Sequence, residues 1–490
     1  MPDEPIPSDS NRRRFFRVFA GDVATSVGSM IGVAQTLQAE AASASRDLLG
    51  MASPVVAQEP PLPRARGPFD ASTAGYRAPF RLDGDAIYIV DQRQLPDILQ
   101  ELELGGAADA INAINDGAIY GSAVHAQLAA STLALVAARA VDSRPFARRA
   151  TIRGAANAFR LTRPGSAAVG HALDRILALL DELGLDALGT EVTAAIATEA
   201  DAIIAEATED HGRIALLAPT ALPGEPDAPL HVLVAGSTGA MGSGQFGTAL
   251  GAVMTIHHGG RPIHALVAET RPALIGSRIA AWELGQAGVP HAVVTDAAAP
   301  GCIASGEVGA VLVSADRVAA NGDLIATVGT YPLALAAADA GIPFLVCVAT
   351  SALDPSLPDG GAATVEEGRP TQVLTVHGRR IAPEGTQVRN PLSELVPASL
   401  VTALVTDEGV LRAPFEASIA GAVGSAADRR SAARGFAALL AQRARAAADA
   451  AADAAAGAVA VAETGAAETD APAEPAATDP AEAGDRTAGS

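Results

Sequence analysis

Short apolar runs rich in β-branched residues recur between residues 230 and 350, and they restrict the fold more than any other feature of the chain. About 15 to 30 residues with helical spacing of apolar side chains separate successive runs. The runs lie at residues 232–234, 265–267, 292–294, 311–313 and 344–348. Strands that alternate with helices are joined by right-handed crossovers, which produce a parallel sheet covered on both faces. The sequence therefore predicts an α/β fold with a Rossmann-like, doubly wound sheet, whose ligands bind at the carboxyl ends of the strands.

The chain before these runs follows a different pattern. From residue 105 to about residue 211 the apolar residues keep helical spacing without strand-like alternation, which predicts a mainly helical domain. Pro-rich stretches without periodicity separate the folded parts. The predicted parts are an amphipathic N-terminal helical extension (1–53), a Pro-rich linker (54–79), the mainly helical domain (80–218), the Rossmann-like domain (219–420), an Ala/Arg-rich helix (421–449) and a disordered acidic tail (450–490).

Residues 12–50 carry competing patterns. Phe15 and Phe19 begin an apolar stripe with helical spacing, which is typical of an amphipathic helix that docks on a protein partner or a membrane surface. Residues 11–17, Asn-Arg-Arg-Arg-Phe-Phe-Arg, are similar to a twin-arginine export signal, with an A-x-A cleavage site at residues 39–41. A plain surface helix is the third interpretation.

The charge of the chain excludes several functions. All 34 basic residues are Arg, and the absence of Lys excludes a Walker phosphate loop, a pyridoxal Schiff base and a lysine nucleophile. A net charge of -21 with 3% aromatic residues argues against nucleic-acid binding. No run of 18 apolar residues occurs, so the sequence predicts no transmembrane helix. Small molecules or proteins are the expected partners.

The metal-ligating residue types show no metal-binding pattern, and we predict neither a metal site nor a cofactor. His257 and His258 are adjacent on a predicted helix, a spacing that cannot place both side chains on one ion. Cys302 and Cys347 are too few for a disulfide framework or a Cys-based zinc site, and this fits a reducing, cytoplasmic compartment. Both are interpreted as small buried residues rather than nucleophiles.

A glycine-rich segment follows the first predicted strand. Residues 236–244, Gly-Ser-Thr-Gly-Ala-Met-Gly-Ser-Gly, lead into a helix predicted to begin near Phe246. Because glycine allows close backbone approach and a helix N-terminus favours anions, this loop is a candidate phosphate cradle; packing alone is the alternative. Polar residues also follow the second and fourth strands, at 269–272 and 314–323, where a carboxylate such as Asp316 can act as general base or hold a sugar hydroxyl. An Asp–Arg pair that merely joins loops is the alternative there.

Several motifs resemble those of one known family, in order and with nearly constant spacing over roughly residues 80 to 420. They are Asp91-Gln92-Arg93-Gln94-Leu95-Pro96, Gly247-Thr248-Ala249-Leu250-Gly251, Glu269-Thr270-Arg271-Pro272, Ala281-Trp282-Glu283-Leu284, the run from Ala315-Asp316-Arg317 to Asn321-Gly322-Asp323, Gly329-Thr330-Tyr331, Ile381-Ala382-Pro383-Glu384-Gly385 and Asn390-Pro391. The family comprises methylthioribose-1-phosphate isomerase of methionine salvage, ribose-1,5-bisphosphate isomerase and the regulatory subunits of eukaryotic translation initiation factor 2B. The resemblance implies a helical N-terminal domain, a Rossmann-like C-terminal domain and homodimers.

The resemblance also implies site residues. In the isomerases of the family, a cysteine in the glycine-rich loop and the aspartate of the Ala-Asp-Arg motif move a proton or hydride between sugar C1 and C2; they align to Gly236 and Asp316. A phosphate-binding arginine aligns to Asp116, a glutamine to Ile275 and a lysine to Thr327. The substrate-binding residues implied by the aligned motifs are Gly117, Ala118, Arg163, Ser237, Thr238, Gly239 and Asn321.

Two functions follow as hypotheses. The lost polar positions favour a member with a degenerate active site that binds a phosphorylated sugar or nucleotide, or serves as an assembly surface. The retained Asp316, Arg163 and glycine-rich loop support the alternative, an aldose–ketose isomerase, which is an intramolecular oxidoreductase, acting on a phosphorylated ribose derivative. Both hypotheses include a cytoplasmic homodimer and a docking partner for residues 12–50.

Overall fold

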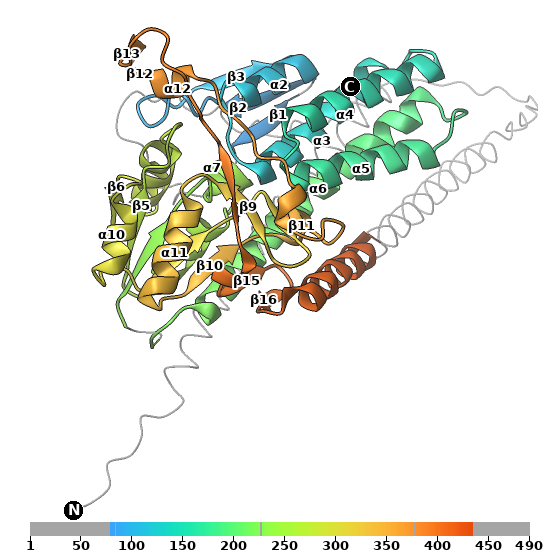
Figure 1. Ribbon diagram of the computed structural model, residues 1–490. Helices are drawn as coiled ribbons and strands as arrows, with labels where there is room; N and C mark the ends of the chain where they lie inside the picture. The colour runs from blue at the N-terminus through green and yellow to red at the C-terminus, as the bar shows by residue number, and fades with distance from the viewer. Residues whose placement is uncertain (1–78, 84, 226–227, 377, 435–490) are drawn as a thin grey trace, which may run out of the picture. The chain divides into compact units, whose positions relative to one another are not determined.

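The computed structural model describes residues 79–83, 85–225, 228–376 and 378–434 (Figure 1). The chain divides into two compact units, residues 1–426 and residues 427–490. The predicted N-terminal helix, the Pro-rich linker up to residue 78 and the acidic tail lie outside the described residues. Along the described ranges, no helix combines the length and the apolar character that crossing a membrane requires.

A seven-stranded sheet forms the centre of the first unit, in the order β16-β15-β10-β7-β4-β5-β6. Its strands are β4 (Leu230–Val234), β5 (Ile263–Ala268), β6 (His291–Val294), β7 (Ala310–Val313), β10 (Phe344–Cys347), β15 (Ala403–Thr406) and β16 (Gly409–Leu411). Neighbouring strands run parallel from β6 to β15, and β16 pairs antiparallel with β15. This is the strand order of doubly wound nucleotide-binding sheets, with the change of winding between β4 and β7. All five predicted runs fall on these strands, so the predicted α/β class with a parallel sheet is confirmed.

The central strand β4 shows how the sheet is buried. Val232 and Val234 pack with α8 (Ala249–His258) on one face, while Leu233 packs on the other face with α10 (Ala299–Ala304) and α11 (Thr330–Ala340). Each of the three side chains is at most 1% exposed. Burial of such side chains stabilises the fold by roughly 1.5–3 kcal/mol each. Because successive side chains alternate between faces, a strand covered on both sides has to be continuously apolar.

A small antiparallel sheet and a set of long helices precede β4. The strands are β1 (Phe80–Asp83), β2 (Ala86–Val90) and β3 (Glu101–Leu104), and the helices are α2 (Ala107–Asn115), α3 (Ser122–Arg139), α4 (Pro145–Thr162), α5 (Ala167–Glu182) and α6 (Gly189–Leu217). Pro145 occupies the first position of α4, and Ser166 caps α5 by accepting the N–H of Val169. The helices span the residues for which helical spacing is predicted, whereas β1 and β3 are not foreseen.

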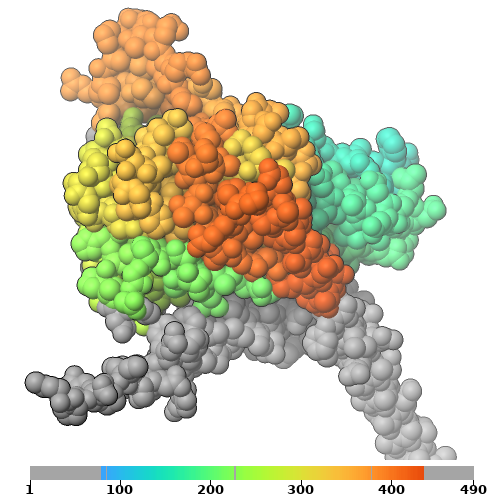
Figure 2. Space-filling model, turned by 60° about the horizontal axis from the view of Figure 1, so that its bottom comes forward, coloured from blue at the N-terminus to red at the C-terminus, as the bar shows by residue number. Residues whose placement is uncertain are grey.

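Two further small sheets lie outside the predicted pattern. One contains β8 (Arg317–Ala319), β9 (Leu324–Thr327), β11 (Leu353–Asp354) and β14 (Ser393–Val396); the other pairs β12 (Thr375–Val376) with β13 (Arg379–Arg380). The segment with α12 (Thr371–Leu374), β12 and β13 projects from the surface (Figure 2). Strands this short carry too few side chains to show an alternating pattern.

The glycine-rich segment differs from its prediction. A short helix, α7 (Ala240–Ser243), forms inside it, and α8 begins at Ala249 rather than near Phe246. Gly121, which precedes α3, approaches Gly242 so closely that a Cβ at either position would meet neighbouring atoms. This contact brings the helical region against the glycine-rich segment. The last described helix spans residues 415–434, so it begins six residues before the predicted start of the Ala/Arg-rich helix at residue 421.

Candidate functional site

Side chains from the helical region and from the sheet meet at Asp316. Asp316 lies between β7 and β8, beyond the carboxyl end of a central strand. Its Oδ1 accepts a 2.5 Å hydrogen bond from Ser122 Oγ at the start of α3, and its Oδ2 lies 3.5 Å from Nη2 of Arg163, which follows α4. The structure therefore brings the predicted residues Asp316 and Arg163 together and adds Ser122, for which the sequence carries no motif.

A second carboxylate, Glu366, contacts the same arginine. Arg163 Nε lies 3.4 Å from Glu366 Oε2, and the N–H of Gly165 donates to Glu366 Oε1 at 3.2 Å. Burial raises the pKa of Glu366, Arg163 opposes this effect, and the Asp316 charge adds to it. Arg163 Nε is buried, and its 3.4 Å contact with Glu366 Oε2 is an ion pair that lacks hydrogen-bond geometry. Glu366 lies in an irregular segment without periodicity, which is why sequence reasoning missed it.

The other half of the site is the loop around Gly236. The φ angle of Gly236 is 84°, a left-handed conformation that costs a residue with a side chain about 1–2 kcal/mol. A Cβ there would lie 3.4 Å from Thr327 Oγ1 and 4.0 Å from Thr238 Cγ2, and the Gly236 N–H donates to Thr270 Oγ1 at 3.3 Å. The nearest groups are thus threonines, whose hydroxyls are poor acids and bases near neutral pH without a neighbouring base.

Buried polar side chains hold the glycine-rich segment in place. Glu283 Oε1 accepts the N–H of Met241 at 2.8 Å, and Gln92 Nε2 donates to Met241 O at 2.8 Å. Gly239 packs so closely on the Glu283 carboxyl that a Cβ would overlap it. Burial raises the pKa of Glu283 to about 8, although the N–H groups of Met241 and Ala240 favour its ionised form. Glu283 lies in the short helix α9 (Ala281–Gln286) and is its only charged residue. This isolated charge was the signal in the sequence from which its role in holding the glycine-rich segment could have been inferred.

The turn that joins α2 to α3 contacts both the loop and a distant segment. Asp116 Oδ1 accepts a 2.6 Å hydrogen bond from Arg369 Nη2. Gly117 has a φ of 71°, and the ring of Tyr120 fills the space where its Cβ would lie. Ser237 Oγ donates to Tyr120 O at 3.4 Å. Gly117, Ser237 and Asp116, the position at which the resemblance implies a phosphate-binding arginine, are therefore connected through this turn.

The remaining predicted residues have different surroundings. Ala118 is buried and can offer a ligand only backbone groups. The side-chain amide of Asn321 makes two 2.9 Å hydrogen bonds with Asp323 inside the turn between β8 and β9, so it is engaged within this turn rather than with Asp316. Thr238 Oγ1 is buried and has no hydrogen-bond partner among described residues. Ile275 lies in an apolar cluster beneath the loop, where the family has a glutamine.

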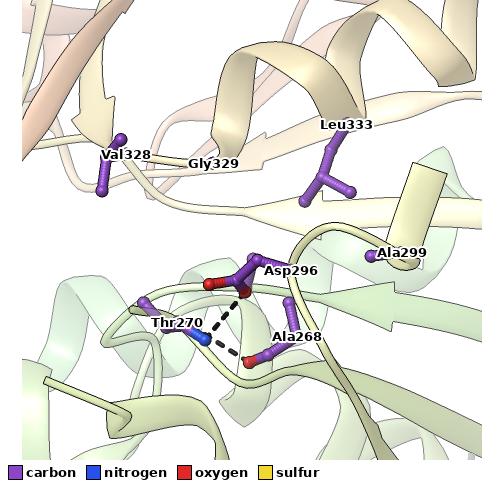
Figure 3. A pocket seen from close by; sticks show the side chains of 8 residues that line it. Ala268, Thr270, Asp296, Ala299, Val328, Gly329 and Leu333 are labelled. Atoms are coloured by element: carbon purple, nitrogen blue, oxygen red, sulfur yellow. Dashed lines mark hydrogen bonds between the residues drawn. The ribbon is translucent and has the colours of Figure 1, made fainter. Parts of the chain in front are cut away.

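A small pocket lies beyond the carboxyl ends of β4, β5 and β6, with room for little more than one water molecule (Figure 3). Thr270 donates its N–H to Asp296 Oδ1 at 2.9 Å and its hydroxyl to Ala268 O at 3.1 Å. Val328 and Leu333 line the opposite side. Thr270 has a φ of 58°, an unusual conformation for a β-branched residue that is found mostly at functional sites.

The two cysteines and the paired histidines lie apart from these features. Cys347 is buried in β10, where burial raises the pKa of its thiol to about 12, and Cys302 is half-buried in α10. The atoms nearest to the Cβ position at Gly236 belong to threonines, so neither thiol replaces the family's cysteine. His257 and His258 end α8. Among the described residues, no three His, Cys, Asp or Glu side chains are grouped closely enough to hold a metal ion.

The sequence matches known proteins over most of the described region. Residues 118–413 match the initiation factor 2 subunit family. A methylthioribose-1-phosphate isomerase from Anaeromyxobacter sp. (strain Fw109-5) is 37% identical over 336 residues, which cover 69% of this chain and 94% of the relative. A protein of the same name from Parasynechococcus marenigrum (strain WH8102) is 39% identical over 337 residues, 68% of this chain and 94% of the relative.

Solved structures give the same result. The 5-methylthioribose 1-phosphate isomerase from Pyrococcus horikoshii OT3 is similar with a TM-score of 0.63 and 28% identity, over 73% of this chain and 99% of that one. The translation initiation factor eIF-2B, subunit delta, from A. fulgidus is similar with a TM-score of 0.59 and 26% identity, over 71% and 99%. The matched residues include Ser122, Arg163, Gly236, Asp316 and Glu366 of the candidate site, whereas Gln92, Asp116 and Gly117 precede them. The chain therefore belongs to the initiation factor 2 subunit family, in which its relatives include methylthioribose-1-phosphate isomerases.

Proposed function

We propose that this protein binds a phosphorylated sugar, or a nucleotide, beside Asp316 and Arg163, and that it does not isomerise the ligand. The relatives named as sugar-phosphate isomerases support the ligand class. Arg163 supports the location, because its contacts of 3.5 Å with Asp316 and 3.4 Å with Glu366 are longer than ordinary charge-assisted hydrogen bonds, so a ligand hydroxyl can compete for its guanidinium. A sugar hydroxyl can accept from this guanidinium and donate to the Asp316 carboxylate, since a hydroxyl is both acceptor and donor.

The observation that carries the proposal is the conformation of Gly236. Isomerisation of an aldose to a ketose requires one group that takes a proton or guides a hydride and a second group that balances charge at the adjacent carbon. At the position of the family's cysteine this chain has a glycine with a φ of 84°, and the nearest side-chain atoms belong to Thr327 and Thr238. The loop half therefore offers hydroxyls where the reaction needs a titratable group.

Ligand-induced thermal shift tests the binding. We expect methylthioribose-1-phosphate or ribose-1,5-bisphosphate to raise the melting temperature and unphosphorylated ribose to leave it unchanged. A ligand at 100 times its Kd adds about 2.7 kcal/mol, which corresponds to several degrees. Arg163→Gln should abolish the shift, whereas Arg160→Gln, which removes an exposed arginine of the same helix, should retain it. An equal shift in both variants would contradict the location.

A second candidate function is an isomerase that uses Asp316 with Glu366. The observation in its favour is that burial raises the pKa of Glu366 while the residue contacts the same arginine as Asp316. Two carboxyl groups in different environments can act as base and acid and carry hydrogen from C2 to C1 of the sugar. Turnover that disappears in both Asp316→Asn and Glu366→Gln would establish this function and refute the first.

We also propose a cytoplasmic homodimer in which residues 12–50 dock on a protein or membrane-surface partner. The family resemblance and the apolar stripe from Phe15 support these proposals. Sedimentation of the full chain tests the dimer. Deleting residues 12–50 should leave the melting temperature nearly unchanged while removing lipid co-sedimentation or partner binding.

A further inference from the structure

The ion pair between Asp116 and Arg369 joins segments that are 253 residues apart in the sequence. Arg369 Nη2 lies 2.6 Å from Asp116 Oδ1, and the two side chains are 58% and 45% exposed. Exposed pairs of this kind contribute about 0–1 kcal/mol, so either partner can be exchanged at little cost. The pair therefore places a readily released guanidinium beside the turn that joins α2 to α3.

The surroundings of this turn are positively charged. Burial raises the pKa of Tyr120, whereas the charges of Arg278, Arg93 and Arg369 lower it. Arg278 Nη2 donates to Gln92 O, and Gln92 Oε1 accepts the N–H of Tyr120 at 3.1 Å, so Gln92 joins Arg278 to the turn. Arg93 is paired with Asp91 through two 2.8 Å hydrogen bonds.

The hydrogen bonds of Arg278 go to backbone carbonyls: it donates to Gln92 O, to Leu95 O at 3.2 Å and to Ala273 O at 3.0 Å. The three arginines thus outnumber the two carboxylates, Asp91 and Asp116, with which they are paired. An anion at the turn would meet net positive charge.

We propose that Arg369 binds the phosphate group of the ligand and that Asp116 holds its guanidinium until the ligand replaces the carboxylate. The inference rests on the proposed function and names the residue that recognises the phosphate. A phosphate carries more negative charge than a carboxylate and presents oxygens for two parallel hydrogen bonds from a guanidinium. Asp116 is released to water without a large desolvation change, because it is already exposed.

This exchange resolves a contradiction in the sequence. A carboxylate at the aligned phosphate-binding position would repel a phosphate, yet Asp116 brings a cation from the segment before α12 to the same turn. The glycine-rich loop contacts the other end of the turn, since Ser237 Oγ donates to Tyr120 O. Arg369 is thus placed to reach a ligand that spans the turn and the loop.

Calorimetric titration of ribose-1,5-bisphosphate into the full chain tests the exchange. We expect Arg369→Gln to weaken binding roughly 10- to 100-fold, the loss typical of a hydrogen bond to a charged group. Asp116→Asn removes the competing carboxylate and should strengthen binding by roughly 3- to 10-fold. The matched control is Arg389→Gln, which removes an exposed arginine of the same segment, paired with Glu367, and should leave binding unchanged.

The results separate this inference from the proposed function. Arg369→Gln that binds like the wild type, or Asp116→Asn that weakens binding as strongly as Arg369→Gln, would overturn the inference while leaving ligand binding intact. A wild-type chain that binds neither ribose-1,5-bisphosphate nor methylthioribose-1-phosphate would refute both proposals. If Arg369→Gln lowers the melting temperature, Arg369→Lys is measured in its place. Lysine keeps the positive charge but cannot make two parallel hydrogen bonds to the phosphate, so the affinity of Arg369→Lys should lie between those of the wild type and Arg369→Gln.

Discussion

The two halves of the candidate site differ in how much chemistry they retain. The carboxylate half, Ser122, Arg163, Asp316 and Glu366, is a connected polar network. The loop half, residues 236–243, has a left-handed glycine, threonine hydroxyls and an apolar floor. On the proposed function, the first half orients a sugar hydroxyl and the second half lacks the group that moves its hydrogen. Binding and catalysis are separable in such a site.

The scaffold under both halves is nevertheless well ordered by specific contacts. Glu283 and Gln92 fix Met241 in the loop half, just as Gly165 and Ser122 fix the carboxylates in the other. Hydrogen bonds thus anchor the loop half as well as the carboxylate half. This contrast can be tested by substitutions in each half.

The largest expected effect concerns Glu283, the anchor of the loop half. Its pKa is raised from 4.5 to about 8, so the neutral acid is favoured in the folded state. The resulting stabilisation is complete below about pH 4.5 and is lost as the pH rises through 8. Between pH 5 and 9 the wild type should therefore lose up to about 4 kcal/mol of unfolding free energy relative to Glu283→Gln.

Urea denaturation at pH 5, 7 and 9 measures this difference. Glu416→Gln, which changes an exposed carboxylate, is the control and should follow the wild-type profile. Parallel profiles for the wild type and Glu283→Gln would show that the anchor does not titrate in this range.

A smaller effect is expected in the carboxylate half. Arg163→Gln leaves Glu366 and Asp316 without their shared cation and should lower the unfolding free energy at pH 7 by about 2 kcal/mol. Arg160→Gln removes an exposed pair and should change it by less than about 1 kcal/mol. Equal losses would mean that the carboxylates are stabilised mainly by solvent.

The conformation of Gly236 in the loop half predicts a loss of unfolding free energy that is equal to or smaller than the loss expected for Arg163→Gln. Gly236→Ala should destabilise the protein by about 1–2 kcal/mol because its φ of 84° disfavours a side chain. Gly301→Ala is the control, since it lies in α10 with open space around its Cβ position and should be neutral or stabilising. If both substitutions are neutral, the loop relaxes to accept a side chain, and the conformation of Gly236 does not disfavour a larger residue at this position.

The smallest effect is expected for Ser122→Ala. It removes the hydroxyl that donates to Asp316, and the loss should be about 0.5–1.5 kcal/mol, the usual contribution of one hydrogen bond. Thermal unfolding of this variant beside Ser131→Ala, whose hydroxyl donates to a helix carbonyl in the same α3, measures the difference. A larger loss for Ser131→Ala would show that the Asp316 contact contributes little to folding.

The parallel sheet could be predicted because β7 and β10 are continuous apolar runs, and β4 and β5 are interrupted by a single histidine each, as two-sided burial requires. Asp316 and Arg163 could be predicted because motifs carry them. Glu366 could not, because it lies in an irregular segment where side-chain spacing is uninformative. The pairing of Asp116 with Arg369 depends on contacts between residues 253 positions apart, which no local pattern encodes.

The central claim is that the loop half no longer supports isomerisation, and a coupled turnover assay on methylthioribose-1-phosphate and ribose-1,5-bisphosphate tests it most directly. The account predicts no turnover above the uncatalysed background for the wild type and for Gly236→Cys, since a single thiol in a strained conformation restores neither the phosphate contacts nor the second group. Turnover by the wild type that disappears in Asp316→Asn would contradict it.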